Sequence, residues 1–252
     1  MSNSYEIVGI IPARYASTRF PGKLLADLNG KTVIQHVYEK CCHSKSLTRV
    51  IIATDDLRIY DHAMQFGAEV VMTAPSIQNG TLRCLAALKK TPHIKTDFMV
   101  NIQGDEPFIL PEEIDHISEA LCNGESDIVT LVTDIDNPAS HQDPNVVKVV
   151  LDQQNYALYF SRLAIPYLDG DSALHTPLYQ HIGIYGFRLS TLRDLIELPP
   201  TTLEKAEKLE QLRWLQHRYP IKTIYTSNTH IGIDVPDDLL RAKAQLKKLN
   251  SL

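Results

Sequence analysis

The sequence predicts an α/β protein with a mostly parallel central sheet and helices on both faces. Short apolar runs, typical of buried strands, alternate with longer amphipathic segments through the first half of the 252 residues. Alternation of this kind is typical of βαβ units. Charged loops also follow two of the apolar runs. Because βαβ crossovers are nearly always right-handed, we expect these loops to lie at one edge of the sheet.

The first half contains four expected strands and four expected helices. Strands are predicted near 6–11, 49–53, 69–72 and 98–102, and helices near 32–43, 57–66, 82–90 and 112–122. In the first of these helices Val33, Val37 and Cys41 recur at fourfold spacing and make one buried stripe.

The second half is less regular. We expect strands at 128–132, 146–150, 157–160, 181–187 and 221–226, and helices near 204–217 and after Pro236. The polar segment 166–178, which contains Pro and Gly, predicts an exposed excursion. One domain over residues 1–252, with an inserted subdomain in its second half, accounts for this order most simply.

Composition excludes several classes of protein. The chain is 44% hydrophobic and 22% charged with a formal net charge of −5, which argues against a nucleic-acid or anionic-membrane partner. Its apolar runs are far shorter than the roughly 20 residues of a membrane helix. The first six residues lack the pattern of a secretory signal, and the four cysteines lack a CxxC spacing. We therefore expect a cytoplasmic protein with reduced, mostly buried thiols and no zinc site.

The loop Ile10–Lys23 follows the first predicted strand, which we expect to end at Pro12. It carries the cations Arg14, Arg19 and Lys23 and a Pro-Gly turn. Cations at the carboxyl end of a parallel strand suit a polyanion such as a triphosphate. A surface loop with solvated charges is the alternative. The GxxxxGK[ST] and GxGxxG patterns are both absent, so neither a P-loop nor a Rossmann dinucleotide site is indicated.

A second loop, Asn101–Pro107, places two carboxylates after another apolar run. Asp105 is a candidate ligand for Mg²⁺, which prefers one or two carboxylates together with phosphate oxygens. For Glu106 the alternatives are a cap on the helix near 112 or a side chain facing solvent. Asp234 precedes Val-Pro and is, from the residues alone, a good N-cap for the final helix.

These motifs, in this order, resemble those of one family, the 3-deoxy-manno-octulosonate (Kdo) cytidylyltransferases. The matching stretches span nearly the whole chain: Ile10–Lys23, Ala53–Asp55, Gly80-Thr81, Asn101–Pro107, Ala157–Arg162, His181–Phe187, Leu209–Arg213 and Asp234–Pro236. Other sugar nucleotidyltransferases share the first stretch, whereas NIQGDEP, ALYFSR and LEQLR together are typical of the Kdo enzymes.

The resemblance implies a nucleotide-diphospho-sugar transferase fold and the reaction CTP + Kdo → CMP-Kdo + pyrophosphate, for lipopolysaccharide biosynthesis. It implies Mg²⁺ as cofactor and a homodimer formed largely by the inserted subdomain. Residues 1–125 would mainly bind CTP, and residues 126–252 would mainly bind the sugar and dimerise. Positioning and charge neutralisation would dominate the chemistry.

The resemblance also implies roles for individual residues. Arg14, Lys23, Asp105 and Asp234 would form the catalytic set, with Asp105 and Asp234 holding the magnesium. The nucleotide would be bound by Ala13, Arg14, Arg19, Lys23, Asn79 and Arg83. The sugar would be bound by Gln103, Arg162, His181, Tyr185, Glu210 and Gln211. For two of these a structural role is the alternative: a core histidine for His181 and an ion pair for Arg162.

One position departs from the family pattern. Leu82 follows Asn79-Gly80-Thr81 where the family usually has a carboxylate. Without that carboxylate near its N-terminus, the helix would lack roughly 0.3–1 kcal/mol of favourable interaction with the helix dipole. Two other readings therefore stay open: a cytidylyltransferase for another acidic sugar, of the 8-amino-Kdo or sialic acid type, and an inactive homologue that binds nucleotide.

Overall fold

The computed structural model describes residues 5–77, 79–135, 137–170 and 176–249. They group into two compact units, Met1–Ser118 with Thr229–Leu252, and Glu119–Asn228. The C-terminal segment thus belongs with the N-terminal half of the chain, and each unit is described below by itself.

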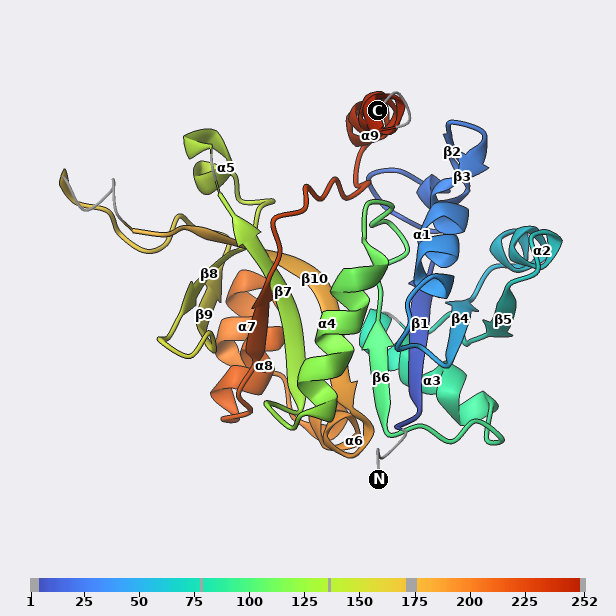
Figure 1. Ribbon diagram of the computed structural model, residues 1–252, viewed down its shortest axis with the longest axis horizontal. Helices are drawn as coiled ribbons and strands as arrows, with labels where there is room; N and C mark the ends of the chain where they lie inside the picture. The colour runs from blue at the N-terminus through green and yellow to red at the C-terminus, as the bar shows by residue number, and fades with distance from the viewer. Residues whose placement is uncertain (1–4, 78, 136, 171–175, 250–252) are drawn as a thin grey trace. The chain divides into compact units, whose positions relative to one another are not determined.

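The first unit is built on parallel strands. Figure 1 shows them side by side in the order β6 (Phe98–Asn101), β1 (Ile7–Ala13), β4 (Arg49–Thr54) and β5 (Glu69–Met72). All four lie where the apolar runs predicted them. The connecting helices are α1 (Val33–Cys42), α2 (Leu57–Gln65) and α3 (Gly80–Lys90). From β1 the chain passes to β4 and then to β5, each on the same side of the strand before it. It then returns through α3 to β6, on the other side of β1. Because the crossovers are right-handed, α3 lies on the opposite face of the sheet from α1 and α2.

The expectation that Pro12 ends the first strand is wrong, because β1 continues to Ala13 and Pro12 pairs with Ala53 of β4. The backbone of Ile10 faces β6, where its carbonyl accepts from Ile102 N at 3.0 Å. Two residues on, Pro12 faces the same side, beyond the last paired residue of β6. Its missing N–H therefore removes no ladder hydrogen bond.

Buried apolar residues hold this unit together. Ile10, Ile11, Ile51 and Ile52 of the central strands are fully buried. The α1 stripe of Val33, Val37 and Cys41 is buried as its spacing predicts. Burial of this apolar surface is the main term that stabilises the sheet beneath the site.

Smaller elements complete the first unit. They are the 3₁₀ turn η1 (Lys23–Leu25), strands β2 (Asp27–Leu28) and β3 (Lys31–Thr32), and helices α4 (Pro111–Cys122, within which the unit boundary falls) and α9 (Pro236–Leu249). Helix α9 lies against β2, where Lys243 Nζ is 3.1 Å from the carboxylate of Asp27. The final helix is therefore anchored beside the loop that carries Lys23.

The second unit contains a mixed sheet. Strand β7 (Ile128–Asp134) pairs in parallel with β11 (Lys222–Tyr225) and antiparallel with β10 (Tyr179–Arg188). Strand β8 (Lys148–Leu151) pairs with β10 and with β9 (Ala157–Ser161), both antiparallel. The five expected strands are present, and the sequence missed two helices, α5 (Pro138–Gln142) and α6 (Leu189–Glu197). Of the expected excursion, 166–170 and 176–178 are half-buried or exposed, while 171–175 lie outside the described residues.

The single helix expected near 204–217 is two helices, α7 (Thr202–Glu207) and α8 (Gln211–Gln216). The break falls at Lys208, whose φ of 54° is left-handed and cannot continue a helix. The carboxylate of Glu207, the last residue of α7, accepts hydrogen bonds from β9 and the residue after it: from Ser161 Oγ at 2.7 Å and from Arg162 N at 2.9 Å. The helix break is therefore accompanied by a tertiary contact, and the sequence contains no Gly or Pro at this point that would predict it.

The cysteines are free thiols, as predicted, but only Cys41 and Cys84 are buried, whereas Cys122 is half-buried and Cys42 is exposed. Among the described residues, no helix is both long and apolar enough to cross a membrane.

Candidate active site

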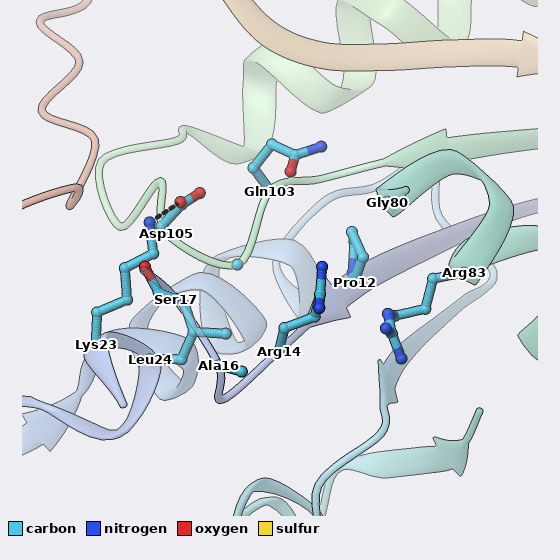
Figure 2. Close-up of a pocket in the computed structure, with 11 residues that line it drawn as sticks. Pro12, Arg14, Ala16, Ser17, Lys23, Leu24, Gly80, Arg83, Gln103 and Asp105 are labelled. Atoms are coloured by element: carbon cyan, nitrogen blue, oxygen red, sulfur yellow. Dashed lines mark hydrogen bonds and ion pairs between the residues drawn. The ribbon is translucent and has the colours of Figure 1, made fainter. Parts of the chain in front are cut away.

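A pocket opens at the carboxyl ends of β1 and β6 in the first unit. Its lining comes from the end of β1, the loop after it, η1, the start of α3 and the loop after β6: Pro12, Arg14, Ala16, Ser17, Lys23, Leu24, Gly80, Arg83, Gln103, Gly104 and Asp105. Figure 2 shows Lys23 and Asp105 meeting on one side of this pocket and Arg83 on the other. Of the residues proposed for nucleotide and metal, Arg14, Lys23, Arg83 and Asp105 line it, and Ala13 is the buried last residue of β1.

The Arg83 side of the pocket is fixed by a buried guanidinium. Arg83 is fully buried, and its side chain donates to Thr73 Oγ1, to Asp55 Oδ2 at 2.8 Å and to the carbonyl of Ile77 at 2.8 Å. Arg14 Nε lies 3.8 Å from the same Asp55 carboxylate. Asp55 thus orients two cations at the pocket, a function that the sequence reasoning did not assign to it.

The loop between Arg14 and Lys23 is shaped around Tyr15. Gly22 has a left-handed φ of 73°, and its N–H donates to the carbonyl of Tyr15 at 3.0 Å. A Cβ at Gly22 would lie 3.1 Å from the Tyr15 ring, so glycine is required here for both reasons. The Arg58 guanidinium lies 3.3 Å from the centre of the Tyr15 ring and covers it. These contacts fix the position of Lys23.

Lys23 joins two carboxylates that are far apart in the sequence. Its Nζ donates to Asp105 Oδ2 at 2.5 Å and to Asp234 Oδ1 at 3.0 Å, and its side chain is only 11% exposed. Burial by itself lowers the pKa of Lys23, but Asp105 and Asp234 outweigh it and leave that pKa raised. Lys23 is therefore charged at neutral pH, and the two acids share its ammonium as a partner.

Asp234 is not the cap of the final helix. Its other oxygen, Oδ2, lies 3.0 Å from Arg19, which is the only contact that places Arg19 near the site among those described. Asp238, at the third position of α9, caps the helix instead by accepting from the backbone N–H groups of Asp234 and Val235 at 2.8 and 2.9 Å. The Asp234 carboxylate is thereby left to face Lys23 and Arg19.

The donor set fits a magnesium ion. Asp105 and Asp234 converge on one positively charged atom, and carboxylate oxygens are the hard ligands that Mg²⁺ prefers. Among the described residues no group of three or more His, Cys, Asp or Glu side chains is placed to hold a metal. A cation bound by these two acids would therefore complete its shell with water and phosphate oxygens, as Mg²⁺ usually does in nucleotide sites.

A buried cluster of three ionisable residues adjoins the two acids. His230 Nε2 lies 3.0 Å from Glu113 Oε1, and His230 Nδ1 lies 3.8 Å from Glu106 Oε2. Glu106 thus follows neither alternative considered from the sequence, since it lies against His230 instead of capping the helix or facing solvent. Glu113 caps α4, because its Oε2 accepts from Leu110 N at 2.8 Å. Sequence reasoning missed His230, whose one signal is a histidine placed shortly before Gly232-Ile233-Asp234.

The cluster predicts a pH-dependent stability. Burial lowers the pKa of His230, but the neighbouring carboxylates of Glu106 and Glu113 raise it overall to about 9. Because the pKa of His230 is higher in the folded than in the unfolded chain, its protonation stabilises the fold. This stabilisation is fully present below the unfolded pKa of about 6.5 and is lost as the pH rises through 9. We expect the free energy of unfolding to fall by on the order of 2 kcal/mol between pH 7 and pH 9. Urea titrations should show this slope in the natural chain and a flatter one in His230→Gln; equal slopes would contradict it.

Two of the residues proposed for the sugar lie together in the second unit. His181 is buried, its Nε2 is 3.0 Å from Thr130 Oγ1, and burial lowers its pKa to about 3, so the ring is neutral. Tyr185 packs beside it, with the rings 5.3 Å apart. The Tyr185 hydroxyl is buried and has no hydrogen-bond partner among the described residues. An unpaired buried hydroxyl is costly unless a ligand binds it, which favours a polar ligand at this point.

The other sugar candidates have different surroundings. Arg162 donates to the carbonyls of Glu207 at 2.9 Å and Pro144 at 3.0 Å, and among the described residues it does not form the ion pair considered as an alternative. Glu210 directly precedes α8, and Gln211 is its buried first residue. Gln103, in the first unit, lines the pocket and donates to Asn101 Oδ1 at 3.1 Å.

Comparison with known proteins identifies the family. The model of the cytidylyltransferase family matches residues 8–224. A 3-deoxy-manno-octulosonate cytidylyltransferase of Parabacteroides distasonis is 48% identical, over 96% of this chain and 98% of its own. The chain belongs to this cytidylyltransferase family.

Two further relatives bear on the fold and on the choice of sugar. The solved structure of a CMP:2-keto-3-deoxy-manno-octonic acid synthetase complexed with CTP has a TM-score of 0.90 at 35% identity, over 96% of this chain and 99% of its own. This match confirms the nucleotide-diphospho-sugar transferase fold expected of the chain. An 8-amino-3,8-dideoxy-manno-octulosonate cytidylyltransferase of a Shewanella species is 41% identical, over 94% of this chain and 97% of its own.

The departure from the cytidylyltransferase pattern lies on the first turn of α3. Asn79 is the N-cap, and its side chain accepts from Leu82 N at 3.1 Å. Leu82, at the third position of the helix, is 41% exposed. Asp55, Thr73 and Ile77 hold Arg83 without any carboxylate at position 82. The missing acid therefore costs the helix start a favourable charge and leaves the orientation of Arg83 intact.

Leu82→Glu is expected to raise stability slightly. A glutamate at this position would complete a capping box with Asn79 and favour the helix dipole, by roughly 0.3–1 kcal/mol in all. Its melting temperature should rise by a few degrees at most, with turnover within about twofold of the natural chain. A tenfold gain in turnover would show instead that the acid acts on the nucleotide.

Proposed function

We propose that this chain transfers the cytidylyl group of CTP to Kdo and releases pyrophosphate. The observation that carries this proposal is the convergence of Lys23, Asp105 and Asp234 beside a pocket that also contains Arg14 and Arg83. Such a site would supply cations for a triphosphate and two acids for a metal at one sheet edge. The names of the relatives supply the sugar, and the product would be an activated sugar for lipopolysaccharide assembly.

The transfer needs little covalent chemistry from the protein. The anomeric oxygen of the sugar would form a bond to the α-phosphorus as the bond to the leaving pyrophosphate oxygen breaks, and the hydroxyl proton is released. Arg14 and Lys23 would bind the phosphates and neutralise the charge that develops on them. Gln103, His181 and Tyr185 would bind the sugar and orient its hydroxyl. His181, being neutral, would act through its hydrogen bonds.

Asp105 and Asp234 would hold Mg²⁺. When bound, the ion would supply a positive charge for the phosphate oxygens and the nucleophile. In the structure Lys23 occupies the position between the two acids. Lys23 would therefore exchange one or both carboxylates for phosphate oxygens when nucleotide and metal enter, and the carboxylates would then pair with the metal.

The experiment that tests this proposal is pyrophosphate release from CTP with Mg²⁺, in parallel reactions with and without Kdo. We expect release to depend on both Kdo and Mg²⁺. Release that is absent with Kdo, in protein shown to bind CTP, would overturn the proposal. Chelation of divalent ions by EDTA should abolish turnover, and added Mg²⁺ should restore it.

A second sugar is worth testing because relatives named for 8-amino-Kdo reach 41% identity. The same assay with 8-amino-Kdo and with a sialic acid measures the preference directly. We expect kcat/KM to be highest for Kdo, since relatives named for that sugar reach 48% identity. A higher value for the amino sugar would reassign the substrate and leave the reaction class unchanged.

We also propose that the protein is a homodimer assembled through its second unit. Large apolar side chains are exposed there on β9 and after it: Leu158 is 60%, Leu163 73% and Tyr167 87% exposed. Neighbouring exposed apolar side chains favour a contact with another surface. Sedimentation velocity should give a dimer for the natural chain and a monomer for Leu163→Glu.

The proposed location is the cytoplasm. All four cysteines are free, which a reducing compartment permits. Cell fractionation, with the activity recovered in the cytoplasmic fraction, would test this location.

A further inference from the structure

The segment His230–Asp234 is joined to the loop that carries Asp105 by contacts that do not involve Lys23. Ile233 N donates to the carbonyl of Asp105 at 2.9 Å. Gly232 lies against Glu106, whose Oε1 would be only 2.9 Å from a Cβ at that position. His230 lies between Glu106 and Glu113. The two acids of the site, Asp105 and Asp234, thus belong to segments that pack backbone against backbone.

His230 is the charged centre of this junction. Its side chain is 2% exposed, and those of Glu113 and Glu106 are 5% and 18% exposed. Charges buried to this extent are retained only when they are paired, and removal of one partner leaves the others uncompensated. The contact with Glu113 is a hydrogen bond, whereas that with Glu106, at 3.8 Å, is an ion pair without one.

Glu113 ties this centre to a rigid element. It is the third residue of α4, where its Oε2 accepts from the backbone N–H of Leu110 while its Oε1 faces His230. The helix start therefore fixes the carboxylate, and the carboxylate fixes the imidazole. From His230 it is four residues to Asp234, and Ile233 between them is already bonded to Asp105.

We propose that His230, held between Glu106 and Glu113, is a positioning residue that sets the spacing of Asp105 and Asp234. This inference rests on the proposed function, in which those two acids hold the metal. Lys23 is the shared cationic partner of both acids while the metal is absent. When Lys23 turns to phosphate, the His230 junction keeps the two carboxylates at the separation the metal requires.

The test uses the full chain with His230→Ala and Glu113→Gln, and His230→Gln as the variant that keeps a hydrogen-bond donor. One readout is the Mg²⁺ concentration that gives half-maximal pyrophosphate release at saturating CTP and Kdo. Residues that orient metal ligands typically change metal affinity or activity 10–100-fold, and we expect His230→Ala to raise that concentration roughly tenfold or more. His230→Gln should recover part of the loss. The KM for CTP at saturating Mg²⁺ should stay within about threefold, because the junction does not touch the nucleotide pocket.

A second readout needs neither metal nor substrate. In the protein without Mg²⁺ or CTP, amide hydrogen exchange of the peptide covering 229–235 should be roughly tenfold faster in His230→Ala, because local opening no longer breaks the buried pair. Peptides from β1 and β4 should exchange as in the natural chain.

The matched control is Asp115→Asn, on the same helix as Glu113. The Asp115 carboxylate accepts from Ser44 Oγ at 2.6 Å and from Lys45 N and Ser46 N at 2.9 Å, all away from the pocket. It should lower the melting temperature without changing the Mg²⁺ requirement or the 229–235 exchange. A Mg²⁺ requirement in His230→Ala equal to that of the natural chain would overturn the inference, as would an equal shift in Asp115→Asn. No turnover in the natural chain with any sugar would be a failure of the proposed function, and the exchange experiment would still decide whether His230 holds the segment.

Discussion

Asp105→Asn is expected to lower kcat for pyrophosphate release by at least about 10³-fold, because it removes a charged ligand of the metal ion that would neutralise phosphate. Asparagine keeps the size of the side chain and one oxygen, but it removes the charge that a metal and Lys23 both require. Asp105 is partly exposed, so the change should leave the fold intact. Turnover at saturating Mg²⁺, CTP and Kdo measures the effect, and circular dichroism on heating checks the fold.

The control for this variant is Asp27→Asn, which removes an equally charged group from an exposed ion pair with Lys243, away from the pocket. It should leave turnover within about twofold, because exposed ion pairs contribute at most about 1 kcal/mol to stability and this one touches no substrate. Activity within tenfold of the natural chain in Asp105→Asn would remove Asp105 from the metal site. Asp234→Asn is expected to behave as Asp105→Asn does.

The sequence was most informative where local signals agreed with tertiary structure. The central strands β1 and β4 of the first unit are short runs rich in Val and Ile, and because both of their faces are buried they stand out in the sequence as continuous apolar runs. The α1 stripe was equally clear, because its fourfold spacing corresponds to a single buried face. The loops that end these strands could then be placed at one edge by handedness, and Arg14, Lys23 and Asp105 do line one pocket.

The sequence was least informative where long-range contacts decide between local alternatives. Asp234 and Asp238 both suit a helix start, and only the position of Lys23 shows which carboxylate caps and which enters the site. Glu106 could not be placed from the residues near it, because its partner His230 lies more than a hundred residues later. Likewise, the left-handed Lys208 follows a glutamate bound to Ser161 and Arg162, a contact that no local pattern encodes.

Lys23→Met is expected to be the second most damaging substitution. The side chain is only 11% exposed and its ammonium is the shared partner of Asp105 and Asp234. Methionine fills a similar volume without the charge, so two neighbouring carboxylates lose their common counter-ion, and phosphate loses a cation. We expect kcat/KM for CTP to fall by roughly 10²–10³-fold, the range found when one preorganised charge-stabilising group is removed.

Lys23→Arg separates charge from geometry in this prediction. Arginine keeps the positive charge, but its planar guanidinium is larger and cannot present one nitrogen to both carboxylates and then to phosphate as an ammonium does. The kcat/KM of Lys23→Arg should therefore exceed that of Lys23→Met by no more than about tenfold, with CTP binding recovered more than kcat. Full rescue by arginine would mean that Lys23 acts only as a diffuse positive charge. An unchanged dependence on CTP in Lys23→Met would place the triphosphate elsewhere and leave Lys23 with the single function of pairing Asp105 and Asp234.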